Sequence, residues 1–389
     1  MDYGESHEAV TLELIGILEG SAELKALLEK SIAKAHQINP DPMTNPVHDL
    51  GSYLRFLDRC SRSMPWEINP TDEYDLLYDR IDQGMGCLYF VCDQPLEELE
   101  GRGYYHNSLI HHQPFSGWFR RFLSAMGSFL DTERSWCDEY FRNALACPSF
   151  HLDDGTYEDP SNWRTFNGFF ARRLADPSRR PISEPDNPCV VVSPADSKPF
   201  GLWRIDSGSR FSEGVGIKTF TFNDVRSLLG CSRFADEFGN GAITHTTLDV
   251  NDYHRFHFPV DGTVREVLHI PQNDGPGGVI TWVSAEGCYR AVKADGLDWQ
   301  PFETRAVVVI ETAKGHVAVV PVGMCQVCSV NFENSVVPGA KVRKGDPMGH
   351  FLFGGSDIAM VFSEDLCFEV SAAPGRHLLM GEEYGRIRI

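Results

Sequence analysis

The sequence predicts an α+β protein in which a helical N-terminal domain is followed by a mainly β domain. Two patterns lead to this fold class. Over roughly the first 160 residues, apolar side chains recur mostly three and four positions apart, which is the spacing of amphipathic helices. After Pro181, short β-branched runs appear between Gly, Pro and Asp residues, as in strands joined by turns. We therefore expect a helical domain over residues 1–160 and a second domain over residues 161–389.

The N-terminal domain is expected to begin with two helices within residues 9–35. Leucine and isoleucine recur there at helical spacing, and the pair Gly20-Ser21 interrupts the pattern, which places a break between the helices. The helical pattern continues from about 47 to 146 and includes aromatic stretches such as Trp118-Phe119. Pro, Asp and Gly then cluster between residues 147 and 160, which is the composition of a linker.

The second domain is expected to open with a helix over residues 163–174 and to continue in strands. The β-branched runs that we interpret as strands are Val190–Val192, Ile243–Leu248, Thr263–Ile270, Val307–Thr312 and Val317–Val322. The last two runs are separated by the turn sequence Ala313-Lys314-Gly315, so they are predicted to pair as a hairpin.

Composition and charge narrow the class of protein. Of the 389 residues, 42% are hydrophobic, which is enough apolar material for a packed core and excludes wholesale disorder. The 35 Lys and Arg against 55 Asp and Glu give a net charge of −20. This balance argues against general binding to nucleic acid and against electrostatic adhesion to anionic lipid.

Cysteine usage and the N-terminal sequence predict a cellular location. The 11 cysteines are scattered singly, and residues 1–23 resemble neither a signal peptide nor an Arg-rich transit peptide. No run of about 18 apolar residues occurs that could cross a bilayer. We therefore expect a reduced, cytoplasmic protein without an integral membrane contact.

Two histidines three positions apart are the first candidates for chemistry. His254 and His257 lie in the segment Asp252-Tyr-His-Arg-Phe-His-Phe-Pro-Val-Asp-Gly262, with acidic residues nearby. Imidazoles exchange protons near neutral pH, so the pair could serve acid–base catalysis. A structural histidine pair is the ordinary explanation of such spacing. No further ligands follow at metal-binding spacing, so we expect no metal site.

Two other short motifs are ambiguous by themselves. Gly354-Gly355-Ser356-Asp357 precedes an apolar run, and such a sequence is usually a turn between strands, although glycines also allow a serine to be steeply exposed. It differs from the Gly-x-Ser-x-Gly elbow of hydrolases, because no second glycine follows Ser356 at the required spacing. Cys325-x-x-Cys328 lacks a second cysteine pair and is interpreted as structural thiols.

Taken together, four segments resemble the phosphatidylserine decarboxylases, which are pyruvoyl-dependent enzymes made as self-cleaving proenzymes. The segments, in the order of that family, are Phe166-Asn-Gly-Phe-Phe-Ala-Arg-Arg-Leu174, Ser193-Pro-Ala-Asp196, Asp252 to Gly262, and Lys344-Gly-Asp through Phe353-Gly-Gly-Ser356. The resemblance spans residues 160–389. The helical extension is similar to that of a fungal soluble branch that includes the tryptophan decarboxylase of psilocybin biosynthesis.

The resemblance implies roles for individual residues. Ser356 matches the serine that becomes the covalent pyruvoyl group, with cleavage between Gly355 and Ser356. Asp196 and His257 match the acid and the base of the self-cleavage triad, and His254 matches the accompanying site histidine. In such a triad the histidine takes the serine proton, and the serine oxygen attacks the preceding carbonyl. The resulting ketone serves as the electron sink for decarboxylation.

Two positions depart from the family pattern. Ser197 stands where the family usually has glycine, and Asp357 stands where Ser or Thr commonly follows the cleavage serine. The second departure places a carboxylate beside the new N-terminus. An unprocessed, non-catalytic family member is therefore a distant alternative.

The substrate expected from the acidic, anchorless sequence is a free L-amino acid, plausibly aromatic such as tryptophan. The alternative is phosphatidylserine, which would be converted to phosphatidylethanolamine. The remaining alternative is a carrier domain, since Val342-x-Lys-Gly-Asp resembles half of a lipoyl motif, but such a carrier needs a lysine at the hairpin tip. The expected partners are the amino-acid substrate and the chain's own cleaved C-terminal fragment, without nucleic acid, and a homodimer is an open alternative.

Overall fold

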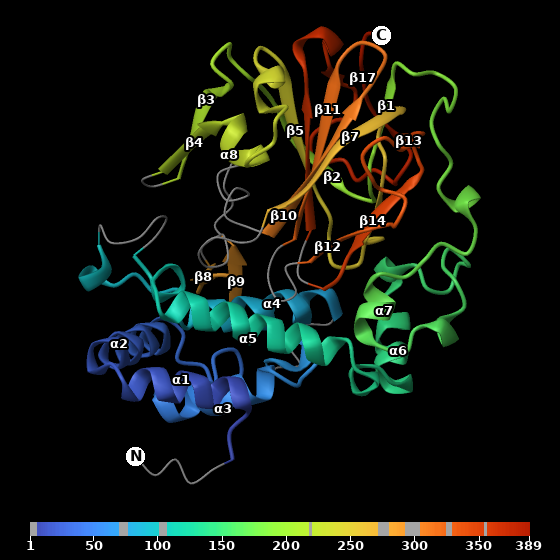
Figure 1. The fold of residues 1–389 in the computed structure, drawn as a ribbon. Helices are drawn as coiled ribbons and strands as arrows, with labels where there is room; N and C mark the ends of the chain where they lie inside the picture. Colours follow the sequence, from blue (N-terminus) through green and yellow to red (C-terminus); the bar gives the residue numbers. More distant parts are fainter. Residues whose placement is uncertain are drawn as a thin grey trace. The chain divides into compact units, whose positions relative to one another are not determined.

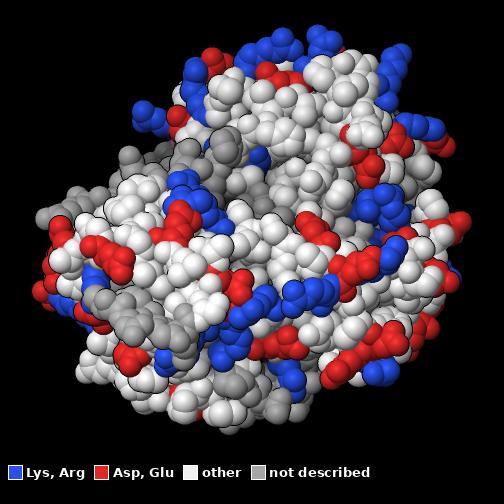
Figure 2. All heavy atoms as spheres, turned by 60° about the horizontal axis from the view of Figure 1, so that its bottom comes forward, with Lys and Arg blue, Asp and Glu red and all other residues white. Residues whose placement is uncertain are grey.

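The computed structural model describes residues 6–69, 77–100, 107–217, 220–270, 280–291, 304–323, 329–353 and 356–389 (Figure 1). Helices dominate the first part of the chain, and strands dominate from β1 (Val190–Val192) onward. The predicted α+β class is confirmed. Among the described residues, no helix combines the length and the apolar character needed to cross a membrane. Acidic and basic side chains are interspersed over the face that Figure 2 shows.

The chain divides into two compact units. The first comprises residues 1–147 and 274–293, and the second comprises 148–273 and 294–389. This division differs from the predicted boundary at residue 160. Residues 148–160 join the second unit because Phe150 packs on Phe169, with ring centroids 5.6 Å apart. Residues 274–293, which lie far along the sequence, join the helical unit.

The helical unit contains six α-helices among its described residues. They are α1 (Ala9–Glu19), α2 (Ala22–Ile38), α3 (Leu50–Cys60), α4 (Leu77–Phe90), α5 (Phe115–Leu130) and α6 (Asp138–Leu145). The predicted break between the first two helices is confirmed at Gly20 and Ser21. The Ser21 hydroxyl accepts a hydrogen bond from Leu24 N at 3.2 Å, which satisfies one of the free N–H groups at the start of α2.

A β-hairpin from the middle of the sequence completes this unit. Strands β8 (Ile280–Val283) and β9 (Cys288–Ala291) pair with each other and contact α4. The Tyr289 ring on β9 is buried, 1% exposed, and packs on Phe90 with centroids 5.2 Å apart. The hairpin is therefore part of the hydrophobic core of the helical unit.

Hydrogen bonds fix the position of this hairpin. The Tyr289 hydroxyl donates to Thr44 O at 2.9 Å and accepts from Asn39 Nδ2 at 3.0 Å. The side-chain amide of Gln83 donates to Tyr289 O at 3.0 Å. Glycine is required at position 86, because a Cβ there would lie 2.6 Å from the Cβ of Tyr289.

The second unit is built on a seven-stranded antiparallel sheet with the order β13-β7-β10-β11-β15-β5-β2. Its strands are β2 (Lys198–Arg204), β5 (Ala242–Thr247), β7 (Gly262–Ile270), β10 (Thr304–Glu311), β11 (His316–Gly323), β13 (Lys341–Val342) and β15 (Ser356–Phe362). The predicted hairpin is confirmed, since β10 and β11 pair from Glu311 and His316 outward. The sheet separates two apolar clusters: Ile358 and Met360 belong to one, and Ala359 belongs to the other.

Smaller elements surround this sheet. They are the three-stranded sheets β12-β14-β6 and β1-β17-β16, the hairpin β3-β4, and the short helices α7 and α8. Their bounds are β3 (Arg210–Ile217), β4 (Phe220–Asp224), β6 (Arg255–His257), β12 (Val330–Phe332), β14 (Pro347–Phe351), β16 (Glu369–Val370), β17 (Glu383–Arg386), α7 (Phe166–Phe170) and α8 (Val225–Leu229).

The helix predicted over residues 163–174 is shorter than expected. Only Phe166–Phe170 is helical, and the Thr165 hydroxyl caps it by accepting from Gly168 N at 2.9 Å. Beyond the helix, Leu174 forms a β-bridge with Tyr157, which draws the chain out of the helical path.

Candidate active site

The predicted site residues come from three segments of the second unit. His257 is the last residue of β6 and His254 immediately precedes this strand, while Asp196 lies four positions after β1. Ser356 is the first residue of β15. Gly354 and Gly355 lie outside the described residues, as does the side chain of Ser356, so the cleavage site itself stays a prediction.

A main-chain contact brings the Asp196 segment to His257. The backbone N–H of His257 donates to Pro194 O at 2.8 Å, two residues before Asp196. The side chains of these two residues nevertheless take different partners. Tertiary contacts, rather than one sequence motif, assemble the candidate site.

The residues before the predicted cleavage site are anchored by the Phe166–Phe170 helix. Asn167 Oδ1 accepts from Phe353 N at 3.1 Å, three positions before Ser356. The Phe353 ring packs edge-on against Phe170, with centroids 5.4 Å apart. Phe170 in turn stacks on the His254 ring at a centroid distance of 3.8 Å. One aromatic ring thus links His254 to the chain that leads to Ser356.

His257 is buried and held by hydrogen bonds at both ring nitrogens. Nδ1 lies 2.8 Å from Gly345 O, and because a carbonyl only accepts, Nδ1 carries the proton. Nε2 is therefore the basic atom, and it accepts from the Tyr253 hydroxyl at 3.2 Å. Burial lowers the pKa of His257, although the Gly345 carbonyl and the charge of Asp196 oppose the shift.

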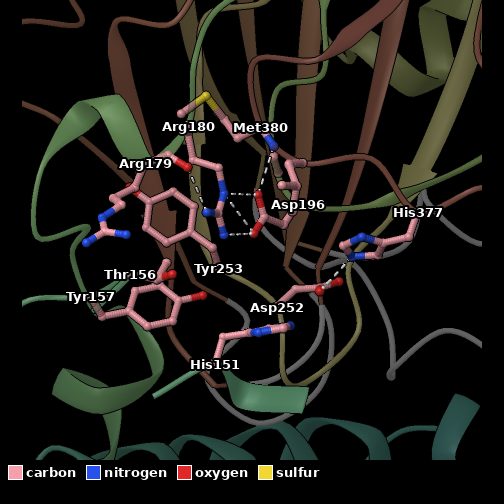
Figure 3. Close-up of polar contacts among 12 residues, drawn as sticks. His151, Thr156, Tyr157, Arg179, Arg180, Asp196, Asp252, Tyr253, His377 and Met380 are labelled. Carbon is pink, nitrogen blue, oxygen red and sulfur yellow. Dashed lines mark hydrogen bonds and ion pairs between the residues drawn. The ribbon is translucent and has the colours of Figure 1, made fainter. Parts of the chain in front are cut away.

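Asp196 forms a buried ion pair with Arg180 instead of a hydrogen bond with His257 (Figure 3). Arg180 Nε donates to Oδ1 at 2.9 Å and Nη2 donates to Oδ2 at 2.6 Å. The Met380 amide also donates to Oδ1, at 2.8 Å. The expected direct Asp196–His257 contact is thus replaced, because a bidentate guanidinium occupies both carboxylate oxygens. The Gly345 carbonyl orients the His257 ring instead.

His254 is held as an uncharged base. Its Nδ1 donates to Asp252 O at 2.9 Å, which leaves Nε2 as the acceptor atom. Nε2 has no hydrogen-bond partner within the part of the chain that the structure describes. Burial, followed by the charge of Arg172, lowers the pKa of His254 to about 3. The group is therefore neutral at physiological pH and able to accept a proton at Nε2.

Sequence reasoning assigned no site role to several residues that the fold brings to these histidines. Tyr253 and Asp252 lie in the histidine segment, so their positions carried a signal. Arg172 lies in the 166–174 segment, where the pair Arg172-Arg173 suggested either anion binding or a favourable interaction with the helix dipole, but no link to His254. Arg180 and His377 lie outside the quoted motifs and carried none. Asp252 Oδ1 accepts from His377 Nε2 at 2.8 Å, and this bond raises the pKa of His377 (Figure 3).

The two departures from the family pattern are accommodated inside the protein. The Ser197 hydroxyl is buried and accepts from Thr246 Oγ1 at 2.7 Å. The Asp357 carboxylate is also buried and lies 2.8 Å from Nε2 of His245 on the neighbouring strand β5. The buried carboxylate of Asp357 therefore faces the imidazole of His245 inside the protein.

The described residues fit a carbonyl group made from the chain itself. Ser356 begins a central strand, and the preceding chain is anchored beside an uncharged imidazole with an unpartnered Nε2. Within the described ranges, no group of three or more His, Cys, Asp or Glu side chains is placed to hold a metal ion. Cys325 and Cys328 lie outside these ranges.

Comparisons with known proteins agree with this site. A family model described as phosphatidylserine decarboxylase matches residues 166–386, which include every predicted site residue. A phosphatidylserine decarboxylase proenzyme of Vibrio campbellii is 28% identical over 253 residues, covering 60% of this chain and 82% of that protein.

Two eukaryotic relatives are longer proteins. Phosphatidylserine decarboxylase proenzyme 2 of Oryza sativa is 33% identical over 210 residues, covering 54% of this chain and 31% of that protein. Phosphatidylserine decarboxylase proenzyme 3 of Schizosaccharomyces pombe is 34% identical over 236 residues, covering 58% of this chain and 22% of that protein. The matched region thus spans less than a third of each of these two relatives.

Proposed function

This chain belongs to the phosphatidylserine decarboxylase family, and we propose that it removes the carboxylate of the serine head group of phosphatidylserine. It is a carboxy-lyase, and the family uses a covalent pyruvoyl group formed from serine. The match over 166–386, together with the names of the relatives, supports this substrate over the free amino acid expected from the sequence.

We assign self-processing to Ser356 and His257. In this proposal the His257 Nε2 takes the Ser356 hydroxyl proton, and the serine oxygen attacks the carbonyl carbon of Gly355. The peptide bond between these residues breaks as an ester forms. The contact with Gly345 O supports the base role, because it fixes the proton on Nδ1 and leaves the lone pair on Nε2. The Ser356 hydroxyl must replace the Tyr253 hydroxyl as the donor to Nε2.

We assign proton handling in the decarboxylation step to His254. When formed, the pyruvoyl group supplies a ketone that withdraws the electrons released with carbon dioxide. From its uncharged state, His254 takes up a proton at Nε2 from the ammonium group of the substrate and delivers it to the carbon that loses the carboxylate. The stacked Phe170 ring restricts the imidazole orientation and limits the access of water to this face.

A free aromatic L-amino acid remains the second candidate substrate. The helical unit, with residues 1–147, lies outside the region matched by the family model, and the net charge of −20 disfavours anionic lipid.

The deciding experiment measures carbon dioxide release from phosphatidylserine in mixed micelles and from tryptophan, phenylalanine and tyrosine in parallel. Turnover of the phospholipid alone supports the proposal. Turnover of an amino acid, with no consumption of phospholipid, selects the second candidate and leaves the decarboxylase assignment intact. Ser356→Ala protein serves as the inactive control in every arm.

A further inference from the structure

Arg172 is a buried cation for which the described residues provide no counter-ion. Its side chain is 0% exposed, and within the described part of the chain no carboxylate lies within ion-pair distance of its guanidinium. Nε and Nη1 have no hydrogen-bond partner among the described residues. Aromatic rings enclose the group instead: its Cζ lies 4.3 Å from the ring centre of Tyr157 and 5.3 Å from that of Phe169.

This arrangement is energetically unusual. Burying a charge without a counter-ion is costly, and cation–π contacts offset only part of that cost. An aliphatic side chain of similar length would fill the same aromatic enclosure without that cost. A charge at this buried position therefore calls for a role that packing does not supply.

The hydrogen bonds of Arg172 lead directly to His254. Nη2 donates to Asn251 O at 2.7 Å and to Asp252 O at 3.0 Å. The same Asp252 carbonyl accepts from Nδ1 of His254 at 2.9 Å. One carbonyl oxygen is therefore shared by the guanidinium and the imidazole. Its position sets the orientation of the His254 ring.

We propose that Arg172 is a positioning residue for decarboxylation, which fixes the Asp252 carbonyl that orients His254. Its positive charge adds to the effect of burial in disfavouring protonation of His254. The inference rests on the role of His254 in the proposed function. Arg172 acts through His254.

The other charged and titratable groups near His254 are accounted for. On its own segment the Asp252 carboxylate is bonded to His377 from the C-terminal stretch, and the Tyr253 hydroxyl is bonded to His257. Burial is the largest cause of the lowered pKa of His254, and the charge of Arg172 lowers this pKa further. The hydrogen bond to the Asp252 carbonyl raises it.

Two neighbouring elements complete this set. Strand β14 contacts the His254 backbone through Phe351 N, and its titratable residue His350 has a pKa lowered to about 4 by burial. Arg255 directs its guanidinium to Ala171 O and to Glu333. Neither group replaces Arg172 as a cation acting on His254.

The test compares Arg172→Met, which removes the charge, with Arg172→Lys, which keeps it but lacks the planar fork. Arg173→Met is the matched control, because Arg173 is the exposed next residue. Intact mass first establishes that each variant is cleaved. We then expect kcat of R172M to fall by about tenfold or more with a nearly unchanged KM, since the step uses a positioned proton carrier.

The pH profile separates positioning from simple structural support. Loss of the charge should move the acid limb of kcat upward by about one pH unit in R172M. R172K should lose rate but keep the wild-type limb, and R173M should match wild type in both readouts. A wild-type limb in R172M, or equal limb shifts in R172M and R172K, would overturn the proposal.

A second readout needs no catalytic activity. In uncleaved Ser356→Ala protein, NMR titration of carbon-labelled histidine should show the His254 midpoint rising by about one pH unit when Arg172→Met is added. An unchanged midpoint in folded protein refutes the electrostatic inference. A shifted midpoint combined with no decarboxylation of any tested substrate would refute the proposed function alone. If R172M does not fold, the same titration on R172K decides, since an altered midpoint there contradicts the retained-charge expectation.

Discussion

Replacing Asp196 with Asn removes the negative charge of a buried ion pair while keeping the shape of the side chain. The Arg180 and Asp196 side chains are 7% and 4% exposed, and three N–H···O contacts of 2.6 to 3.2 Å join them. Removing one partner leaves the other charge buried and uncompensated, which costs about 3–5 kcal/mol. The Asn oxygen can still accept from Met380 N, so the loss should come mainly from the charge.

The double variant Asp196→Asn, Arg180→Met separates ion pairing from chemistry. Removing both charges together leaves no uncompensated ion, so we expect the double variant to lie within about 1–2 kcal/mol of wild type. Each single variant should be lower by about 3–5 kcal/mol. The double-mutant cycle then gives a coupling energy of about 4–9 kcal/mol, because the two single losses together exceed the loss in the double variant by that amount.

Two assays measure the stability and the self-cleavage of these variants. Urea unfolding of all four chains in the uncleavable Ser356→Ala background gives the free energy of unfolding. Intact mass of the same substitutions with Ser356 present gives the fraction cleaved. If Asp196 serves self-cleavage, the double variant recovers stability but remains uncut. Wild-type cleavage in the double variant would show that Asp196 is only the counter-ion of Arg180. Single variants as stable as wild type would refute the argument from burial.

The remaining predictions concern processing, the hairpin, pH and metal. Intact mass of the wild-type protein should show two chains of about 355 and 34 residues, whereas the Ser356→Ala protein should remain one chain of 389 residues. An uncut wild-type protein would contradict the cleavage assignment. Gly86→Ala should lower the free energy of unfolding by about 1–3 kcal/mol, because the new Cβ would lie 2.6 Å from the Tyr289 Cβ. Thermal unfolding measures this loss, and Gly16→Ala is the control because a Cβ there meets nothing within 4 Å. Burial lowers the pKa of His254 to about 3, so the stability that the neutral imidazole contributes is present above about pH 6.5 and is lost as pH falls toward 3. His254→Gln should therefore flatten the acid side of a plot of unfolding free energy against pH. An unchanged slope would argue against a neutral buried imidazole. Dialysis against EDTA should leave carbon dioxide release unchanged, and activity restored only by added zinc would instead favour a metal role for the histidines.

Local sequence patterns determined the elements and the candidate segments of this protein. The break at Gly20-Ser21, the paired strands around Ala313-Lys314-Gly315 and the order of helices before strands all follow from periodicity and turn residues. These features depend on neighbours only a few residues away. The histidine segment was identified in the same way.

Tertiary structure alone decided which distant groups become partners. Tyr289 enters the helical core by bonding to Asn39 and Thr44, which lie more than 240 positions away in the sequence. Arg180 takes both oxygens of Asp196, although the sequence suggested His257 as the partner. Buried donors and acceptors must be satisfied by whatever groups the fold brings within about 3 Å, and no periodicity in the sequence specifies those distances.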